Sequence, residues 1–570
     1  MKIGDAFFQN KNISVLPSES RLLLFFAPPK VEKKVTPLLP LLPRHEKGRE
    51  DAACRQMRRA IRENGFMPSP FYFRYPWGAQ ILADGSGDMD WIWGPAERRK
   101  PGNYARFFCA LQFLRAGRVM EAEWELQEVL PFFGIQRYLD GMHDWIWQHR
   151  SFLCRNGINF CWNQLWDSQD PRLVQFSLWY LCFYRSSHEE YLRKIVPFLS
   201  QCGAFTVQCL RIISEWEDAQ DLIFKIAQYS KDYARYAAVR YLNPETPGAQ
   251  DWLIRRAPKD TRMPMNFAFL CAKKGDLDGR LAQEQISQED FAGAGKLIAR
   301  LIPHNAPYRN LSDLQRSAVV LKNYLRHARV YAKTLEDFDV VSDIYWTTQY
   351  YTYQNLELKE EVSQASLALL KSPRCLALLE PEMVEGNRVA YYIAQQIGMP
   401  YQRQAMRQIQ LNFWQNYHLA DFLLPKHAAE EILALFEQRL PVQILWYHKR
   451  RPKRSQIERE WMSRTEAALG YILSKLQKLP GKGEKLLLGG IKSIYIERRE
   501  QALIALEKWE KIPKKLQLQL RQAERYGYHL PSEKERRHRL RVLAGLEQPE
   551  GEEPPQEQTQ GGQKEAENEP

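Results

Sequence analysis

The sequence predicts an all-α protein built as an array of short amphipathic helices. Apolar residues recur at helical spacing through most of the 570-residue chain, and glycines or prolines separate the apolar stripes. Hydrophobic residues make up 44% of the sequence, which is enough to bury a large core. A chain of this length is expected to form two or more domains or one extended repeat array.

Residues 1–66 have an irregular, proline-rich pattern. The segment APPKVEKKVTPLLPLLPR interrupts any helix with five prolines, so we expect an extended arm there. The arm is followed by one short helix over DAACRQMRRAIREN, which ends at Gly65. Residues 67–103 are rich in tryptophan and glycine and are expected to form a loop segment.

Residues 104–445 carry the helical array. In RVMEAEWELQEVLPFF, one apolar stripe is formed by Ala122, Leu126, Val129, Leu130 and Phe133. A similar stripe is formed by Ala429, Ile432, Leu433, Phe436 and Leu440. Asp170 and Pro171 have the pattern of an N-cap followed by a first-turn proline. The segment DIYWTTQYYTYQ has a strand-like composition, but the apolar spacing before it favours a helix.

Helix-breaking residues divide this region into helices of one to two dozen residues. We expect the breaks at Gly117, Gly134, Gly157, Pro197, Gly203 and Pro244. Successive amphipathic helices of this kind resemble HEAT-type repeats, in which each helix pair buries its apolar face on the next pair. A HEAT-like solenoid is therefore one form that the predicted array can take, although no strict period aligns.

Residues 446–546 are predicted to be a basic helical module. Between 449 and 546 the chain has 25 Lys+Arg and 11 Asp+Glu, and two further helices are expected over QIEREWMSRTEAALGYILSKLQKL and QALIALEKWEKIPKKLQLQLRQAER. The run HKRRPKR, near Trp446, Tyr447 and Trp461, either contacts phosphates or is a solvated face. We therefore expect residues 448–546 to bind a protein or another anionic partner, unless the acidic tail covers them.

Residues 547–570 form an acidic tail that contains eight Glu and one Lys. The tail is expected to be disordered, because it offers almost nothing to bury.

The sequence predicts a cytoplasmic protein. No segment reaches the ~18 consecutive apolar residues of a transmembrane helix, and the N-terminus lacks the pattern of a secretory signal. The nine cysteines have no C-x-x-C spacing, so we expect reduced, buried thiols.

No cofactor motif is found. The three G-x-G starts, at Gly85, Gly293 and Gly481, lack the third glycine of a dinucleotide-binding turn and are interpreted as glycine turns between helices. The single E-x-x-H, from Glu535 to His538, falls in a charged helix rather than in a di-iron pattern. The residues therefore supply no flavin, haem or metal motif.

The short sequence Asp-Trp-Ile-Trp occurs twice, and the candidate binding residues lie in or beside its two copies. Aromatic and polar side chains around its two copies are candidates for an apolar pocket that holds a small hydrophobic ligand. These residues are Asp90, Trp91, Trp93, His143, Asp144, Trp145, Trp147 and His149. The alternative is core or inter-repeat packing, which is the more frequent role of aromatic residues at helical spacing.

The two tryptophan-rich segments, GDMDWIWGPAERRKPGNYARFF and RYLDGMHDWIWQHRSFLC, resemble bacterial limonene hydroxylase. The resemblance implies an oxidoreductase that uses NAD or NADP. Such a monooxygenase hydroxylates the monoterpene limonene to carveol and perillyl alcohol and oxidises these alcohols further. It assigns no catalytic residue. The residues by themselves favour the alternative, a non-catalytic helical repeat scaffold or adaptor with a basic C-terminal module.

Overall fold

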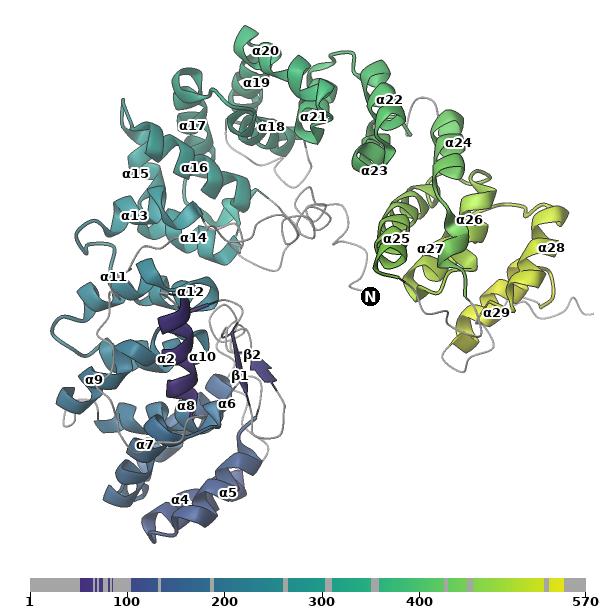
Figure 1. Cartoon of the computed structure of the whole chain (residues 1–570). Coiled ribbons are helices and arrows are strands. Elements are labelled where there is room, and N and C mark those ends of the chain that lie inside the picture. The colour runs from purple at the N-terminus through teal and green to yellow at the C-terminus, as the bar shows by residue number, and fades with distance from the viewer. Residues whose placement is uncertain are drawn as a thin grey trace, which may run out of the picture. The chain divides into compact units, whose positions relative to one another are not determined.

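The computed structural model is all-α, as predicted, in the residues it describes (Figure 1). These residues are 52–64, 67–68, 71–74, 80–82, 85, 104–131, 135–184, 189–259, 265–302, 310–349, 358–424, 429–447, 455–526 and 533–547. The predicted arm up to residue 51 and the tail beyond residue 547 lie outside them. A short antiparallel hairpin pairs β1 (Tyr72–Arg74) with β2 (Gln80–Leu82).

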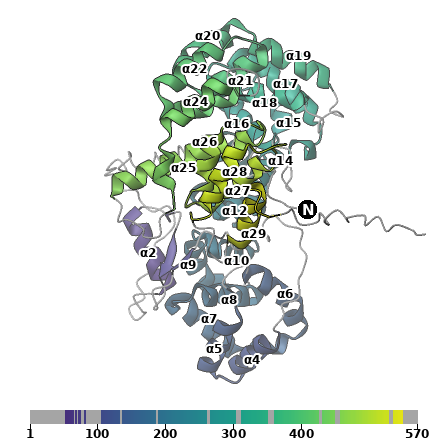
Figure 2. The same cartoon turned by 90° about the vertical axis from the view of Figure 1, so that its right-hand side faces the viewer.

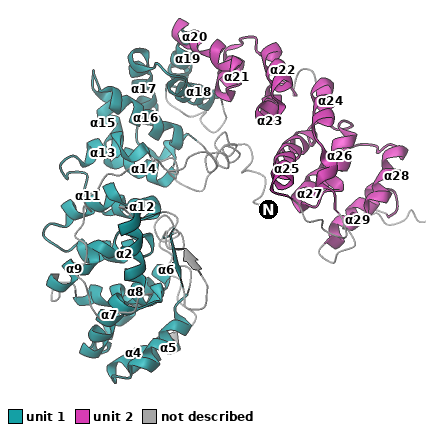
Figure 3. Ribbon diagram, in the orientation of Figure 1, with its two compact units in different colours: residues 1–372 teal, residues 373–570 magenta. Residues whose placement is uncertain are grey.

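The chain divides into two compact units, residues 1–372 and 373–570 (Figure 3). The division falls within residues 104–445, which were predicted to form one array. None of the helices in the described part of the chain combines the length and apolar character that crossing a membrane requires.

The first unit begins with the short helix predicted before Gly65, α2 (Ala53–Asn64), which buries Met57 and Ile61. Helices α4 (Tyr104–Arg115) and α5 (Val119–Val129) then form a hairpin. Gly117 lies in the turn of this hairpin with a φ of 73°, a conformation that suits glycine. The predicted stripe of α5 is confirmed at Ala122, Leu126 and Leu130, which are all buried.

Helix α8 (Pro171–Leu181) is the centre of the N-terminal part, because every one of its residues is buried. It packs against α5, α6 (Ile135–Gln148), α7 (Arg155–Asp167) and α10 (Gly203–Ile213). The predicted cap is confirmed, since the Asp170 carboxylate accepts the Arg172 N–H at 2.9 Å and Pro171 occupies the first turn. An apolar helix without a polar face can be stable only when other helices surround it.

The remaining helices of the first unit stack in consecutive order (Figures 1 and 2). They are α9 (Glu189–Leu199), α11 (Ala219–Tyr229), α12 (Asp232–Tyr241), α13 (Ala249–Arg255), α14 (Met265–Lys274), α15 (Leu277–Ala282), α16 (Gln288–Leu301), α17 (Ser317–Tyr331), α18 (Leu335–Gln349) and α19 (Lys359–Leu370). The even-numbered helices from α8 to α18 each contact the next even helix, and we call them the even layer. The odd-numbered helices from α7 to α19 pack beside them as the odd layer.

The helix predicted across the strand-like segment is confirmed, because α18 extends to Gln349. Residues 350–354 of that segment lie outside the described part of the chain.

Two of the predicted breaks were wrong, because Gly157 and Pro197 lie inside α7 and α9. Gly157 is needed there for space, since a Cβ at this position would lie 2.2 Å from the Tyr180 hydroxyl oxygen. Pro197 stands near the C-terminal end of α9. The breaks at Gly117, Gly203 and Pro244 do lie at or between helix ends, and Gly134 is outside the described residues.

The prediction of a glycine turn at Gly293 was also wrong, because Gly293 and Gly295 lie inside α16. A Cβ on Gly293 would lie 2.0 Å from the carbonyl oxygen of Ile254, and one on Gly295 would lie 2.7 Å from the Tyr324 hydroxyl. These glycines therefore allow α16 to approach α13 and α17 closely. By contrast, Gly481 lies in a turn between α25 and α26 with a φ of 79°, as predicted. Gly85 also has a positive φ, 84°, but it follows β2 rather than a helix.

Cationic side chains cap the C-terminal ends of neighbouring helices at two places in the stack. Lys274 Nζ of α14 donates to three carbonyls at the end of α12, those of Val239 (3.0 Å), Arg240 (2.7 Å) and Leu242 (2.7 Å). Arg326 Nη2 of α17 donates to three carbonyls around the end of α15, those of Leu281 (3.0 Å), Ala282 (3.3 Å) and Gln283 (2.7 Å). Such cations satisfy carbonyls that have no partner within their own helix.

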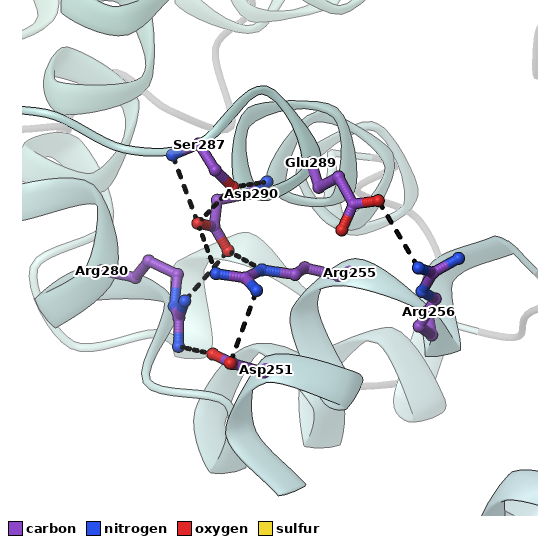
Figure 4. Close-up of polar contacts among 7 residues, drawn as sticks. All are labelled: Asp251, Arg255, Arg256, Arg280, Ser287, Glu289 and Asp290. Atoms are coloured by element: carbon purple, nitrogen blue, oxygen red, sulfur yellow. Dashed lines mark hydrogen bonds and ion pairs between the residues drawn. The ribbon is translucent and has the colours of Figure 1, made fainter. Parts of the chain in front are cut away.

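An ion-pair network joins α13, α15 and α16 (Figure 4). The Asp290 carboxylate accepts hydrogen bonds from Arg255 Nε at 2.8 Å, Arg280 Nη1 at 3.0 Å and Ser287 Oγ at 2.6 Å. Burial by itself would raise the pKa of Asp290, but the bonds from Arg255 and Ser287 outweigh it and hold this pKa at about 2. The ionised carboxylate thus links α13, α15 and α16.

The second unit continues with short helices. They are α20 (Pro373–Val384), α21 (Arg388–Ile397), α22 (Gln402–Leu411), α23 (Phe413–Asn416), η8 (Tyr417–Phe422), α24 (Ala429–Arg439), η9 (Val442–Leu445), α25 (Gln456–Leu476), α26 (Glu484–Ile491), α27 (Ile496–Leu506), α28 (Lys514–Ala523) and α29 (Lys534–Leu543). The predicted helix after residue 455 is confirmed as α25. The single helix predicted over residues 501–525 was wrong. Two helices, α27 and α28, occupy this region, and they are separated by a segment that contains Pro513.

Candidate functional site

Helix α6 carries most of the described candidate residues. His143, Asp144, Trp145 and Trp147 lie within it, and His149 follows its last residue. The other three candidates, Asp90, Trp91 and Trp93, belong to the first Asp-Trp-Ile-Trp copy and lie outside the described residues.

One face of α6 belongs to the core. Ile135, Leu139, Met142 and Ile146 recur at helical spacing and are at most 3% exposed. The candidate aromatic residues therefore lie on the flanks of this face, where they contact two different neighbours.

On one flank, His143 and Trp147 stack on Phe183, which follows α8. The ring centroid of Phe183 is 4.8 Å from that of His143 and 6.1 Å from that of Trp147. Trp147 is 51% exposed, and the Arg150 guanidinium lies 4.0 Å from its ring centroid. This flank presents an aromatic surface that a cation already covers in part.

On the other flank, Trp145 and His149 stack on each other with ring centroids 4.4 Å apart. His149 Nδ1 lies 2.8 Å from the carbonyl oxygen of Trp145, and the Trp145 ring contacts Phe108 and Phe152. Residues two apart on an α-helix point roughly 200° apart, so Trp145 faces away from His143 and Trp147. The described side chains therefore do not meet in one pocket, and their contacts are those of packing between helices.

A polar network beside α6 was missed in the sequence. Gln136 Nε2 donates to Asp140 Oδ1 at 2.9 Å, and Arg211 Nη2 of α10 pairs with Asp140 Oδ2 at 3.0 Å. Gln208 of α10 donates to Gln136. The spacing of positions 136, 140, 143 and 147 does place them on one stripe of α6. Their partners on α10 could not be inferred from this spacing, because they are about 70 residues away in the sequence.

The charge state of this network favours a structural role. Burial disfavours the charged form of Arg211, but the hydrogen bond and charge of Asp140 outweigh burial and hold the arginine pKa above its ordinary value. Burial also raises the pKa of Tyr241, although Arg211 opposes this shift. Arg211 therefore stays charged at neutral pH, and its pair with Asp140 connects α6 to α10.

The buried thiols are unsuited to nucleophilic chemistry. The nine cysteines are unpaired, and seven are buried as predicted, whereas Cys109 is exposed and Cys154 is partly exposed. Burial raises the pKa of the Cys54 thiol to about 11 and that of Cys375 to about 12. A thiol in such surroundings stays protonated and inert at neutral pH.

The basic module neutralises many of its arginines internally. Its ion pairs include Arg498 with Glu466, Arg536 with Glu500, Arg537 with Glu524, Arg539 with Glu507 and Arg541 with Glu547. The aromatic residues predicted to interleave with the basic run make separate contacts. Trp446 packs edge-on against Tyr526, whereas Trp461 packs edge-on against Trp414. The run at 448–454 lies outside the described residues.

Neither a metal site nor a dinucleotide turn can be assembled from the described residues. His538 Nδ1 lies 2.7 Å from Glu547 Oε2, and the described part of the chain has no group of three His, Cys, Asp or Glu side chains placed to hold a metal ion. A dinucleotide turn joins a parallel strand to a helix, whereas the sheet among the described residues is one antiparallel hairpin. NAD or NADP as a cofactor stays an expectation from the resemblance.

Comparison of the chain with protein-family models, with curated proteins and with solved structures gave no match.

Proposed function

We propose that the chain is an α-helical repeat scaffold that binds a macromolecular partner along its first unit. The observation that carries the proposal is the consecutive stacking of the even layer from α8 to α18, with the odd layer packed beside it. An array built from neighbour contacts presents a long, continuous surface, and proteins with this architecture commonly bind other macromolecules through it. The ion pairs and caps between neighbouring helices, such as those of Asp290 and Lys274, hold that surface in register.

The two layers can be tested separately for partner binding. A photo-crosslinking phenylalanine analogue would replace one exposed residue at a time in the full chain, inside the native host cell. On the odd layer the positions are Tyr191, Tyr229 and Val330; on the even layer they are Lys273, Ala292 and Glu336. We expect one adduct of defined mass from several positions on one layer and none from the other. Absence of any adduct from all six positions would contradict the proposal.

Limonene oxidation with NAD or NADP is the competing proposal that the resemblance supports. The feature of the structure that favours it is the half-exposed Trp147, which stacks with His143 on Phe183. If this surface binds limonene, Trp147→Ala should raise KM at least tenfold. Val330→Ala, which removes an equally exposed apolar side chain elsewhere, should leave KM unchanged.

A further inference from the structure

Four lysines between α27 and the first turn of α28 form a positive surface that the unit does not neutralise. Lys508, Lys511, Lys514 and Lys515 are all exposed. We call them the lysine cluster. No ion pair to any of the four is found among the described residues, whereas the arginines of α29 pair with glutamates. Glu510 is the one acidic residue between the first and last lysine.

The position of the cluster increases its attraction for an anion. Lys514 and Lys515 begin α28, and no acidic residue stands in the first turn of this helix. The N-terminal end of a helix carries a partial positive charge, so cations there are destabilising unless an anion is bound nearby. Lys514 and Lys515 are also adjacent in the chain, so their like charges repel each other. The cluster therefore favours a polyanionic occupant over water alone.

The last described residues lie against the same helix. Arg521 Nε of α28 donates to the carbonyl oxygen of Ala544 at 3.0 Å, and a Cβ on Gly545 would lie 3.8 Å from Gln517 Nε2. Gln517 is about one turn along α28 from Lys514, a rise of roughly 5 Å. The chain thus leaves the described structure at Glu547, beside α28, the helix that Lys514 and Lys515 begin.

The chain beyond this point is strongly acidic. Residues 548–570 contain seven Glu and one Lys. A random-coil chain of 23 residues has a root-mean-square end-to-end distance of roughly 25 Å, about the length of a 16-residue helix, so a segment this long can extend along α28 to Lys514. The first carboxylate of the acidic sequence, Glu547, already pairs with Arg541 of α29, whose Nε lies 2.6 Å away, and it lies 2.7 Å from His538 Nδ1.

We propose that the acidic segment 548–570 binds the lysine cluster as an intramolecular polyanion and shields it from other polyanions. Because the segment is tethered beside its site, its effective concentration there is on the order of millimolar, so weak single contacts suffice. The attraction is between exposed charges, so salt should weaken it.

Zero-length carbodiimide crosslinking of the full chain at low salt tests the contact directly. The reagent joins a lysine amine to a carboxylate that touches it, and mass spectrometry identifies the joined residues. We expect crosslinks from Lys508, Lys511, Lys514 or Lys515 to glutamates between 550 and 569, and their loss at 0.5 M salt, a concentration well above that at which exposed charges are screened. Exposed Lys478 on the same unit is the matched control and should give at least fivefold fewer crosslinks. No crosslinks, or equal crosslinking of Lys478, would overturn the proposal.

A binding experiment distinguishes the tail from an external occupant. In one full-length variant, the seven glutamates from 550 to 569 are changed to glutamine; a second variant also carries Lys508→Gln, Lys511→Gln, Lys514→Gln and Lys515→Gln. We expect the first variant to bind a short single-stranded DNA oligonucleotide at least tenfold more tightly than the unaltered chain, and the second to lose this gain. Equal affinity of the unaltered chain and the first variant would mean that the tail does not shield the cluster.

Discussion

Single buried carboxylates hold together helices that are far apart in the sequence. Asp290 is the clearest case, because its pKa of about 2 keeps it ionised between Arg255 and Arg280 (Figure 4). Arg255 is 35 residues from Asp290, so no local sequence pattern could predict the pair. By contrast, the cap of Asp170 was predictable, because an N-cap and its first-turn proline are adjacent in the chain.

Replacing this carboxylate should destabilise the first unit. Asp290→Asn removes the buried carboxylate and leaves Arg255 and Arg280 with only the exposed Asp251 as an anion, so we expect a loss of about 3 kcal/mol in the free energy of unfolding. The matched control is Glu289→Gln, which removes an exposed carboxylate 3.5 Å from Arg256 and should change stability by less than ~0.5 kcal/mol. Urea denaturation followed by circular dichroism measures both. Equal effects of the two substitutions would contradict this account of the network.

His418 should make the second unit sensitive to mild acid. Burial of its ring and the neighbouring charge of Arg388 lower the pKa of His418 to about 4, although Asp421 opposes the shift. The unfolded chain, with an ordinary histidine pKa near 6.5, then binds a proton that the folded chain does not. Stability contributed by the neutral ring is therefore present above pH ~6.5 and declines as the pH falls towards 4.

The urea midpoint of the wild-type chain should consequently fall between pH 6.5 and 4. His418→Gln removes the titrating group, so the midpoint of this variant should fall less steeply over the same range. The test is whether the urea midpoint falls less steeply in the variant than in the wild type. The size of each fall is not the test, because carboxylates titrate in both proteins. A steeper fall for the variant would show that His418 is not buried in its neutral form.

At the scale of elements, helices were predictable from apolar periodicity, but the residues inside them that permit close packing were not. Gly157, Gly293 and Gly295 all lie within helices, where sequence rules expect breaks or turns. Their role depends on which side chain or backbone lies opposite, such as the Tyr180 hydroxyl above Gly157. The same is true of α6. Its apolar face could be predicted from the sequence, but its aromatic partners on other elements could not.

Adding a methyl group at Gly157 should separate α7 from α8. The Tyr180 hydroxyl accepts the Cys154 N–H at 2.8 Å and donates to the Phe152 carbonyl at 2.9 Å, and the new Cβ would displace it. We expect Gly157→Ala to lower the free energy of unfolding by about 2 kcal/mol through overpacking and the lost hydrogen bonds. Calorimetry of Gly157→Ala, Tyr180→Phe and the double variant measures the coupling. Fully additive effects would exclude a contact between the two residues.

The cation that caps α12 gives a second prediction for the elements. Lys274→Met keeps most of the side-chain length but leaves three carbonyls without their donor, so we expect a loss of about 2 kcal/mol. Lys273→Met is the matched control, because Lys273 is exposed on the same helix and should have an effect below ~0.5 kcal/mol. Hydrogen exchange should also show faster exchange at the α12 end in the first variant alone.

At the scale of the whole molecule, the all-α array was predictable because its signal repeats along hundreds of residues. The division at residue 372 was not, since no composition change marks it in the sequence. The candidate residues of α6 were assigned from residue type, but their positions on opposite flanks became visible only with the helix in three dimensions.

The central claim, that the chain acts as a scaffold rather than as a limonene oxidase, can be tested by one turnover measurement. Highly purified full-length protein would be incubated with limonene and either NADH or NADPH in air, beside an identically purified mock from cells that lack the gene. Gas chromatography then measures carveol and perillyl alcohol. The scaffold account predicts no product above the mock. Product that co-purifies with the chain and decreases in Trp147→Ala would contradict it and direct attention to the exposed flank of α6.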